Sequence, residues 1–258
     1  MILLLNVIGI FILSIIQGIT EFLPISSSSH LILVSEYFDF KNQGLSVDVS
    51  LHVGSFIAVI FYFYKDIINF YKKKILFFKI LISSIPIMVI GFFLVETNYI
   101  EKIRNIETIG WTTIIFGILL YISDKFKLEK NIKNDFSFKT AILIGIFQIF
   151  SLVPGVSRSG IAITAARILR FERTDAVKIS YLLSIPILGA VSFFGIKNII
   201  FSEDFYFTKI NLIAVLLSFS FSFITIKFFL KFISKFNLNL FVYYRIILGI
   251  FLLTLAYL

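Results

Sequence analysis

The sequence predicts an all-α, polytopic membrane protein, built as a helical bundle with two re-entrant helix pairs of inverted topology. Composition is the first reason, because 59% of the 258 residues are hydrophobic and the mean hydropathy is +0.99, which excludes an ordinary soluble domain. Several apolar windows also approach the roughly 20 residues that cross a hydrocarbon core of about 30 Å. Two polar, proline-containing stretches, 17–30 and 151–164, interrupt this apolar sequence.

The first polar stretch breaks an apolar N-terminal run. Residues 2–22 are apolar, Pro24 interrupts the run, and a short second piece extends from about 28 to 36. Neither piece suits a simple span, because irregular backbone is tolerated at membrane depth only where protein or water covers it. A re-entrant pair over about 2–36 meets this requirement. The polar cluster takes the place of a small-residue cleavage site, so we do not interpret the run as a removable signal peptide.

Regular spans and a second broken pair follow. In order, we expect spans at about 47–64, 79–95 and 107–123, a broken pair at about 138–152 and 160–169, and spans at about 178–196, 211–230 and 240–258. The chain is therefore predicted to form a single membrane domain over 1–258, with halves 1–124 and 125–258. The second re-entrant pair lies at about 138–169.

Positive charge is concentrated in alternate connections. The Lys- and Arg-rich loops, which we expect on the cytoplasmic side, lie at 65–79, 125–139, 167–178 and 227–235. The neutral or acidic connections, which we expect outside, lie at 36–48, 96–107 and 197–209. These loop positions are consistent with one another only if the first broken pair enters and leaves the membrane at the outer face and the second enters and leaves at the inner face. Loop charge also explains the net charge of +9, so no nucleic-acid partner is expected.

The two polar stretches share the pattern P-x-x-S-x-S. A shift of 130 positions matches Pro24 with Pro154, Ser27 with Ser157 and Ser29 with Ser159. The first stretch carries Glu21 and His30, and the second carries Arg158. Ionisable groups at membrane depth indicate a functional site by default, and inverted repeats place such sites near the midplane, where broken helices meet.

The second stretch has the composition of a phosphate site. Arg158 is expected to open a helix, whose N-terminus offers unpaired N–H groups while the guanidinium matches phosphate oxygens. Glycine allows close approach of the backbone to a ligand. The candidate substrate-binding residues here are Gly155, Ser157, Arg158, Ser159 and Gly160. The alternative is a structural arginine that pairs with Glu21.

The first stretch offers oxygen ligands and a nucleophile. Gln17 and Glu21 lie four apart on one helical face, where they could bind a divalent cation or form a helix-packing polar pair. The serines could cap a short helix. Four consecutive serines followed by His30 also match a hydroxyl nucleophile with an imidazole that transfers protons. His52 is expected to be a packing residue or a supporting neighbour of the site.

At these residues the chain resembles the undecaprenyl-diphosphate phosphatases of the bacitracin-resistance family. E-F-L-P-I-S-S-S-S-H-L-I-L and P-G-V-S-R-S-G look like its two motifs, and the resemblance covers essentially the whole chain. It implies a multi-pass enzyme of the bacterial plasma membrane, with the active site facing outward. The enzyme would hydrolyse C55 polyprenyl diphosphate to undecaprenyl phosphate and inorganic phosphate, with Mg²⁺ or Ca²⁺ as cofactor. Such recycling of the lipid carrier serves cell-wall synthesis and confers bacitracin resistance.

The resemblance also implies roles for individual residues. Glu21 would hold metal or act as a base, Ser27 would be the nucleophile, His30 would handle protons and Arg158 would bind phosphate. Ser26 and Ser28 would join the substrate-binding set, and Gln17 the metal ligands. His30 as nucleophile and a directly attacking water stay open as alternatives. Partners are the lipid substrate and membrane lipid; the oligomeric state stays open, with a homodimer among the options.

Three positions depart from the family pattern. Gln17 stands where many members have Glu, which weakens it as a charged ligand. Ser29 replaces the usual Gly before the histidine, so the backbone there must avoid a glycine-only conformation. Ile161 and Ala162 replace Ala-Thr, which removes a hydroxyl that Thr164 could replace. Rival functions on the same architecture are a secondary transporter or lipid flippase and an anion channel, neither of which would release phosphate.

Overall fold

The computed structural model describes residues 2–37, 44–70, 74–97, 102–201 and 209–258. These residues form helices and connecting loops, with one isolated bridge between Lys130 and Phe171. The principal helices are α1 (Ile2–Thr20), α2 (Ser27–Tyr37), α3 (Gly44–Tyr62), α5 (Lys74–Glu96), α7 (Ile106–Asp124), α9 (Phe138–Gln148), α10 (Arg158–Ile168), α11 (Arg173–Phe201), α12 (Lys209–Ile233) and α13 (Asn239–Tyr257). Short helices α4 (Tyr64–Phe70), α8 (Ile132–Asp135) and η2 (Ile149–Leu152) connect them. The all-α prediction is confirmed.

Five of the described helices are long and apolar enough to cross a membrane: α5, α7, α11, α12 and α13. Large apolar side chains on them, such as Phe93 and Ile247, are exposed, as expected for a surface that faces lipid. The chain is therefore a multi-pass helical membrane protein. Helix α11 extends beyond the predicted span at 178–196 at both ends, through Arg173 and Lys197, whose long side chains can reach out of the apolar zone. The division into halves 1–124 and 125–258 stays a prediction.

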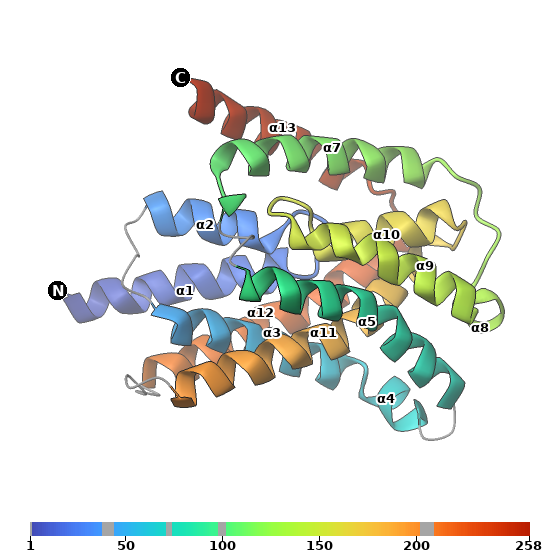
Figure 1. The fold of residues 1–258 in the computed structure, drawn as a ribbon, viewed down its shortest axis with the longest axis horizontal. Helices are drawn as coiled ribbons and strands as arrows, with labels where there is room; N and C mark the ends of the chain where they lie inside the picture. Colours follow the sequence, from blue (N-terminus) through green and yellow to red (C-terminus); the bar gives the residue numbers. More distant parts are fainter. Residues whose placement is uncertain (1, 38–43, 71–73, 98–101, 202–208) are drawn as a thin grey trace.

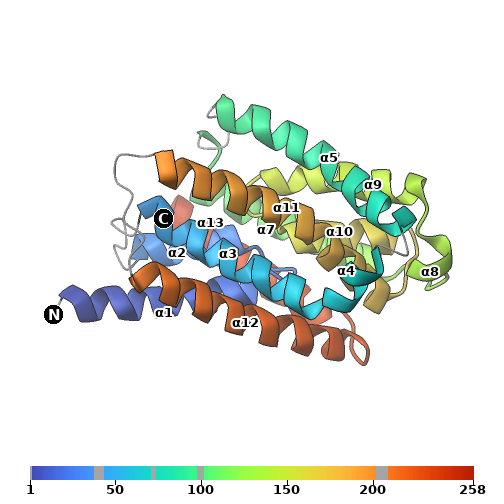
Figure 2. The ribbon, with the colours of Figure 1, turned by 90° about the horizontal axis from the view of Figure 1, so that it is seen from below.

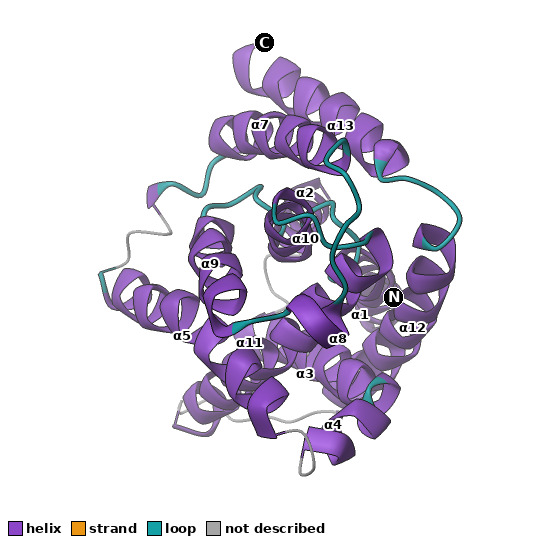
Figure 3. Ribbon diagram, turned by 90° about the vertical axis from the view of Figure 1, so that its right-hand side faces the viewer, coloured by secondary structure: helices purple, strands orange, loops and turns teal. Residues whose placement is uncertain are grey.

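The long helices pack in pairs. In Figures 1 and 2, α12 runs along α3, α5 runs beside α9, and α7 pairs with α13 at one edge. Close approach requires glycine at some crossings: a Cβ on Gly54 of α3 would lie 2.4 Å from the Val215 carbonyl oxygen. Seen along the bundle (Figure 3), α2 and α10 lie one behind the other, between the α7–α13 pair and the remaining helices.

Two helix pairs are joined by loops that meet inside the bundle. The α1–α2 pair lies at the N-terminal end of Figure 1, and the α9–α10 pair comes from the opposite end. The two pairs touch where the hydroxyl of Ser159, in the first turn of α10, donates to the Leu23 carbonyl of the first loop at 2.7 Å. Segments more than 130 positions apart in sequence therefore share one site.

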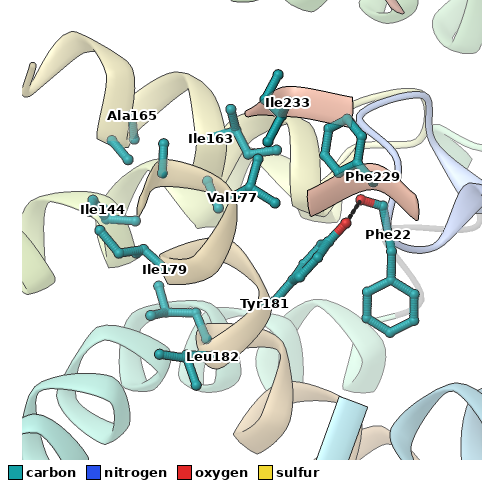
Figure 4. Packing of buried hydrophobic residues seen from close by; sticks show 14 of the residues in the cluster. Phe22, Ile144, Ile163, Ala165, Val177, Ile179, Tyr181, Leu182, Phe229 and Ile233 are labelled. Atoms are coloured by element: carbon teal, nitrogen blue, oxygen red, sulfur yellow. Dashed lines mark hydrogen bonds between the residues drawn. The ribbon is translucent and has the colours of Figure 1, made fainter. Parts of the chain in front are cut away.

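A tyrosine of the hydrophobic core is hydrogen-bonded to the loop between α1 and α2. Tyr181 of α11 is fully buried, and its hydroxyl donates to the Phe22 carbonyl oxygen at 3.1 Å (Figure 4). The Phe22 ring packs edge-on against the Tyr181 ring, with centroids 5.3 Å apart. A buried tyrosine needs such a hydrogen-bond partner, so this contact fixes the backbone next to Glu21.

The described parts of the basic loops are tied to one another at one end of the bundle. The contacts are Lys178 Nζ with Asp66 Oδ1 at 2.9 Å, Arg170 Nη1 with Glu129 Oε2 at 2.7 Å, and Leu238 N with Asp124 Oδ2 at 3.3 Å. Because opposite charges and a backbone donor join different connections, the loops that the sequence assigns to one side gather at one end.

Candidate active site

The chain between α1 and α2 turns sharply. Thr20 ends α1, the Glu21 N–H donates to the Gln17 carbonyl at 3.0 Å, and Ser27 begins α2. Ser26 has a φ of 71°, in the left-handed region that costs a non-glycine residue on the order of 1 kcal/mol. Its hydroxyl lies 2.8 Å from the Ser29 hydroxyl. Ser29 itself is helical, so the departure from glycine there causes no backbone conflict.

The second loop prepares the N-terminus of α10. Gly155 has a φ of +92°, and a Cβ there would lie 1.9 Å from the Thr112 hydroxyl, so only glycine fits. The same hydroxyl donates to the Pro154 carbonyl at 2.6 Å. Ser157 caps α10 by accepting from the Gly160 N–H at 3.1 Å. The predicted phosphate segment thus folds as a glycine turn followed by a capped helix start.

A carboxylate and a guanidinium meet between the loops. Arg158 Nη2 donates to Glu21 Oε1 at 2.6 Å, while Ser27 Oγ and Gln17 Nε2 donate to Glu21 Oε2 at 2.7 and 3.1 Å. Glu21 is only 6% exposed. Arg158 Nη1 is also buried, without a hydrogen-bond partner. A buried N–H of this kind normally finds an acceptor, so the guanidinium retains capacity for an anion.

These groups open onto a cavity of about 210 Å³. Its polar lining comprises Glu21, Ser26, Ser27, His52, Ser151, Ser157 and Arg158, and its apolar lining comprises Ile87, Leu152, Val156, Ile187, Leu188 and Val191. The polar groups come mostly from the two loops, whereas the apolar ones come mostly from α5 and α11. A polar end beside apolar walls suits an amphiphilic ligand.

Gln17 is oriented by two neighbours. Its Nε2 lies 3.1 Å from Glu21 Oε2 and 3.1 Å from His52 Nδ1. Because an amide nitrogen is a donor only, His52 Nδ1 accepts and its proton sits on Nε2. Gln17 Oε1 is buried without a hydrogen-bond partner. His52 was expected as a packing or supporting residue, and it is both a neighbour of Gln17 and part of the cavity wall.

The oxygen atoms here fit a hard cation. The Glu21 carboxylate, the Gln17 amide oxygen and the Ser27 hydroxyl are ligands of the type that Mg²⁺ and Ca²⁺ prefer. Among the described residues, no group of three or more His, Cys, Asp and Glu side chains could hold a metal. One carboxylate with neutral oxygens leaves most coordination positions to water or to the ligand, as Mg²⁺ bound with phosphates usually requires.

His30 faces away from this centre. Its Nδ1 donates to the Ser26 carbonyl at 2.6 Å, and its Nε2 accepts from the Tyr244 hydroxyl at 2.6 Å. Neither ring nitrogen bonds to Ser27, whose hydroxyl bonds to Glu21 instead. The structure thus brings together Glu21, Ser27 and Arg158 directly, and links His30 to them through the loop backbone.

Of the remaining predicted residues, Ser159 and Gly160 lie in the first turn of α10, with the Ser159 hydroxyl 3.1 Å from the Ser157 hydroxyl. The side chain of Ser28 lies outside the described residues. Thr164 is buried and donates to the Gly160 carbonyl at 2.8 Å, so it does not supply a hydroxyl to the cavity in place of the one absent at Ala162.

Two residues of α13 that contact the candidate site were not predicted from the sequence. Tyr244 bonds to His30, and Arg245 is 1% exposed with its guanidinium among backbone carbonyls of both loops. Tyrosine is common in this sequence and gave no signal. An arginine within the predicted span 240–258 did give one, because an intramembrane charge indicates function by default.

Fold and site together define a multi-pass helical membrane protein whose acid, hydroxyl and guanidinium groups meet in a cavity between two interrupted helix pairs. The chain belongs to the family described as bacitracin resistance protein BacA, whose profile matches residues 10–251.

Curated relatives of the chain match along almost its whole length. It is 48% identical over 253 residues to an undecaprenyl-diphosphatase of Pelagibacter ubique (strain HTCC1062), with 98% of each chain covered. It is 36% identical over 261 residues to an undecaprenyl-diphosphatase of Jannaschia sp. (strain CCS1), covering 96% of this chain and 98% of the relative. The undecaprenyl-diphosphatase of Saccharophagus degradans is 39% identical over 259 residues, covering 95% and 96%.

Proposed function

We propose that this protein is a membrane phosphatase that hydrolyses undecaprenyl diphosphate to undecaprenyl phosphate and inorganic phosphate. The observation that carries the proposal is Arg158 Nη1, which is buried without a hydrogen-bond partner beside the Glu21 contact, in a cavity with apolar walls. Family membership and relatives with the name undecaprenyl-diphosphatase support it. The hydrolysis would recycle the lipid carrier of cell-wall synthesis and confer bacitracin resistance. The transporter and channel alternatives are not favoured.

The terminal phosphate binds at the second loop. Arg158 Nη1, which has no hydrogen-bond partner, and the first turn of α10 are positioned to hold its oxygens, because guanidinium groups and helix N-termini both bind phosphate. Ser157, Ser159 and the close backbone at Gly155 and Gly160 complete this cradle. The polyprenyl chain lies along the apolar cavity residues. Charge neutralisation at the phosphate is the main requirement of phosphoryl transfer.

Ser27 is the proposed nucleophile. Its hydroxyl already donates to Glu21 Oε2 at 2.7 Å, so the carboxylate can accept the proton as the oxygen attacks the terminal phosphorus. The bond from that phosphorus to the bridging oxygen breaks, undecaprenyl phosphate leaves, and water then hydrolyses the phosphoserine. Direct attack by water or by His30 is the alternative. His30 handles protons in our proposal, with its ring oriented by the Ser26 carbonyl and the Tyr244 hydroxyl.

Mg²⁺ or Ca²⁺ is the proposed cofactor. Glu21, Gln17 and Ser27 would hold the ion, with Gln17 contributing the buried amide oxygen that lacks a partner. Bound there, such an ion supplies positive charge next to phosphate oxygens. The Glu21 carboxylate also pairs with Arg158.

We further propose that the pairs α1–α2 and α9–α10 are re-entrant and form an inverted repeat in the bacterial inner membrane. Their approach from opposite ends (Figure 1) and the gathering of basic loops at one end support this topology, since that end would be cytoplasmic. His52 and Val191 lie in the halves of α3 and α11 away from the basic end, which favours an active site facing outward. A homodimer stays a prediction.

The test is phosphate release by the purified chain in detergent. Undecaprenyl diphosphate, or farnesyl diphosphate as a soluble substitute, should yield inorganic phosphate and the lipid monophosphate. Release should stop with a chelator and in the Glu21→Ala variant. If the folded wild-type chain released no phosphate but moved labelled lipid across vesicles, the flippase alternative would replace this proposal.

A further inference from the structure

Arg245 occupies an unusual position in the bundle. It lies in α13 and is 1% exposed, although arginine is among the residues least often buried. It takes part in none of the ion pairs found among the described residues. A buried charge without a counter-ion is costly, so a specific set of interactions must hold it there.

Those interactions are with backbone carbonyls on three separate segments. Nη1 donates to Pro24 O at 3.2 Å, Nη2 donates to Gly155 O at 3.1 Å, and Nε donates to Thr113 O of α7 at 3.2 Å. Pro24 and Gly155 are the turning points of the two loops that carry Glu21 and Arg158. A single planar guanidinium therefore joins both loops and anchors them to α7.

We propose that Arg245 is a positioning residue that clamps the two loops and so holds Glu21 and Arg158 in contact. The kinetic part of this inference rests on the proposed phosphatase function. Hydrogen bonds from a charged donor are stronger than those between neutral groups, and the loops have few backbone hydrogen bonds of their own. Without the clamp, we expect the loops to separate and the catalytic groups to lose their spacing.

The clamp requires the fork of the guanidinium as well as its charge. Lysine keeps the charge, but its single ammonium cannot reach carbonyls on three segments in the same geometry. Arg245→Lys should lower kcat by roughly tenfold or more, as misplacement of catalytic groups typically does. If only the positive charge of Arg245 mattered, the lysine variant would keep a kcat near the wild-type value.

If Arg245→Lys does not fold, a milder variant can still test the clamp. A Cβ on Gly117 of α7 would lie 3.1 Å from Arg245 Cβ, so Gly117→Ala displaces the clamp and removes no polar group. Gly110→Ala is the matched control on the same helix pair, because its Cβ would meet Leu253 side-chain atoms at 2.8 Å and the Gly249 carbonyl oxygen at 3.3 Å, and not Arg245. Gly117→Ala should lower kcat severalfold more than Gly110→Ala. This difference should not depend on which of the two variants has the lower melting temperature.

Hydrogen exchange tests the clamp without any assay of activity. In Arg245→Lys and Gly117→Ala, backbone amides at 21–27 and 153–160 should exchange faster in parallel, while amides in the middle of α7 and α13 keep their wild-type rates. Faster exchange along α7 and α13 with unchanged loops would show a packing residue only and overturn the proposal, as would equal kcat losses in the two glycine variants. If the wild type hydrolysed nothing, the phosphatase proposal would fail and exchange alone would decide the clamp.

Discussion

Glu21 Oε1 and Arg158 Nη2 lie 2.6 Å apart, although 137 positions of sequence separate the two residues. The contact spans two loops that belong to different helix pairs. A carboxylate and a guanidinium at membrane depth must be paired or hydrated, and each of these groups also keeps a second function open: Glu21 bonds to Ser27, and Arg158 keeps one buried N–H without a partner.

Replacing Arg158 by Lys should lower turnover by about tenfold or more, because lysine keeps the charge and loses the two-pronged geometry that fits phosphate. Phosphate release by the purified variant measures the effect. Arg170→Lys is the control, since Arg170 is 52% exposed and pairs with Glu129 in a loop. Near-normal turnover in Arg158→Lys would remove this residue from the phosphate site.

Ser27→Ala should reduce phosphate release by at least about 100-fold if the Ser27 oxygen forms a covalent intermediate. Rapid acid quenching followed by mass spectrometry should then find phosphate on Ser27 in the wild type. Ser220→Ala is a suitable control, because that hydroxyl is exposed and bonds to its own helix. Label on His30, or on neither residue, would favour one of the alternative nucleophiles.

Gln17→Glu should lower the concentration of Mg²⁺ or Ca²⁺ that gives half-maximal activity, by roughly tenfold, because a second carboxylate replaces a neutral oxygen ligand. Gln17→Ala should raise that concentration. Titration of the metal-stripped protein, by activity and by calorimetry, measures both. If the two variants required the same metal concentration as the wild type, Gln17 would be only a packing partner of Glu21 and His52.

Tyr244→Phe should lower kcat severalfold and leave KM nearly unchanged, because the phenol fixes His30 by a 2.6 Å hydrogen bond and does not line the cavity. Tyr243→Phe provides the control, since this neighbour on α13 is 59% exposed. A rise in KM with unchanged kcat would instead indicate that Tyr244 binds the lipid.

Gly54→Ala should destabilise the bundle by about 1–3 kcal/mol, the usual cost of overpacking. The added methyl group would lie 2.4 Å from the Val215 carbonyl oxygen, a backbone atom that cannot move without shifting α12. Gly91→Ala should cost much less, since its methyl group meets only the end of the Leu152 side chain at 3.3 Å. Melting temperatures in detergent compare the two, and equal shifts would argue against close packing of α3 on α12.

Sequence reasoning located the fold class and the broken segments because hydropathy and proline are local signals. The apolar runs bounded α7, α12 and α13 within a few residues. It also proposed Glu21, Ser27 and Arg158 as site residues, and the structure brings the three side chains into contact. His30 shows the limit, since the sequence suggested a contact with Ser27 while the ring bonds to Tyr244. Arg245 shows it too, because its three acceptors are backbone carbonyls, which leave no trace in residue identity.

The most direct test of a single site built from both loops is a double-mutant cycle at Glu21 and Arg158. Phosphate release from undecaprenyl diphosphate would be measured for the wild type, Glu21→Gln, Arg158→Gln and the double variant. Groups that act as one unit are strongly non-additive, so each single change should cost at least about 100-fold and the double variant little more than the worse single. Losses that multiply in the double variant would mean that the two residues act independently, and would contradict the shared site.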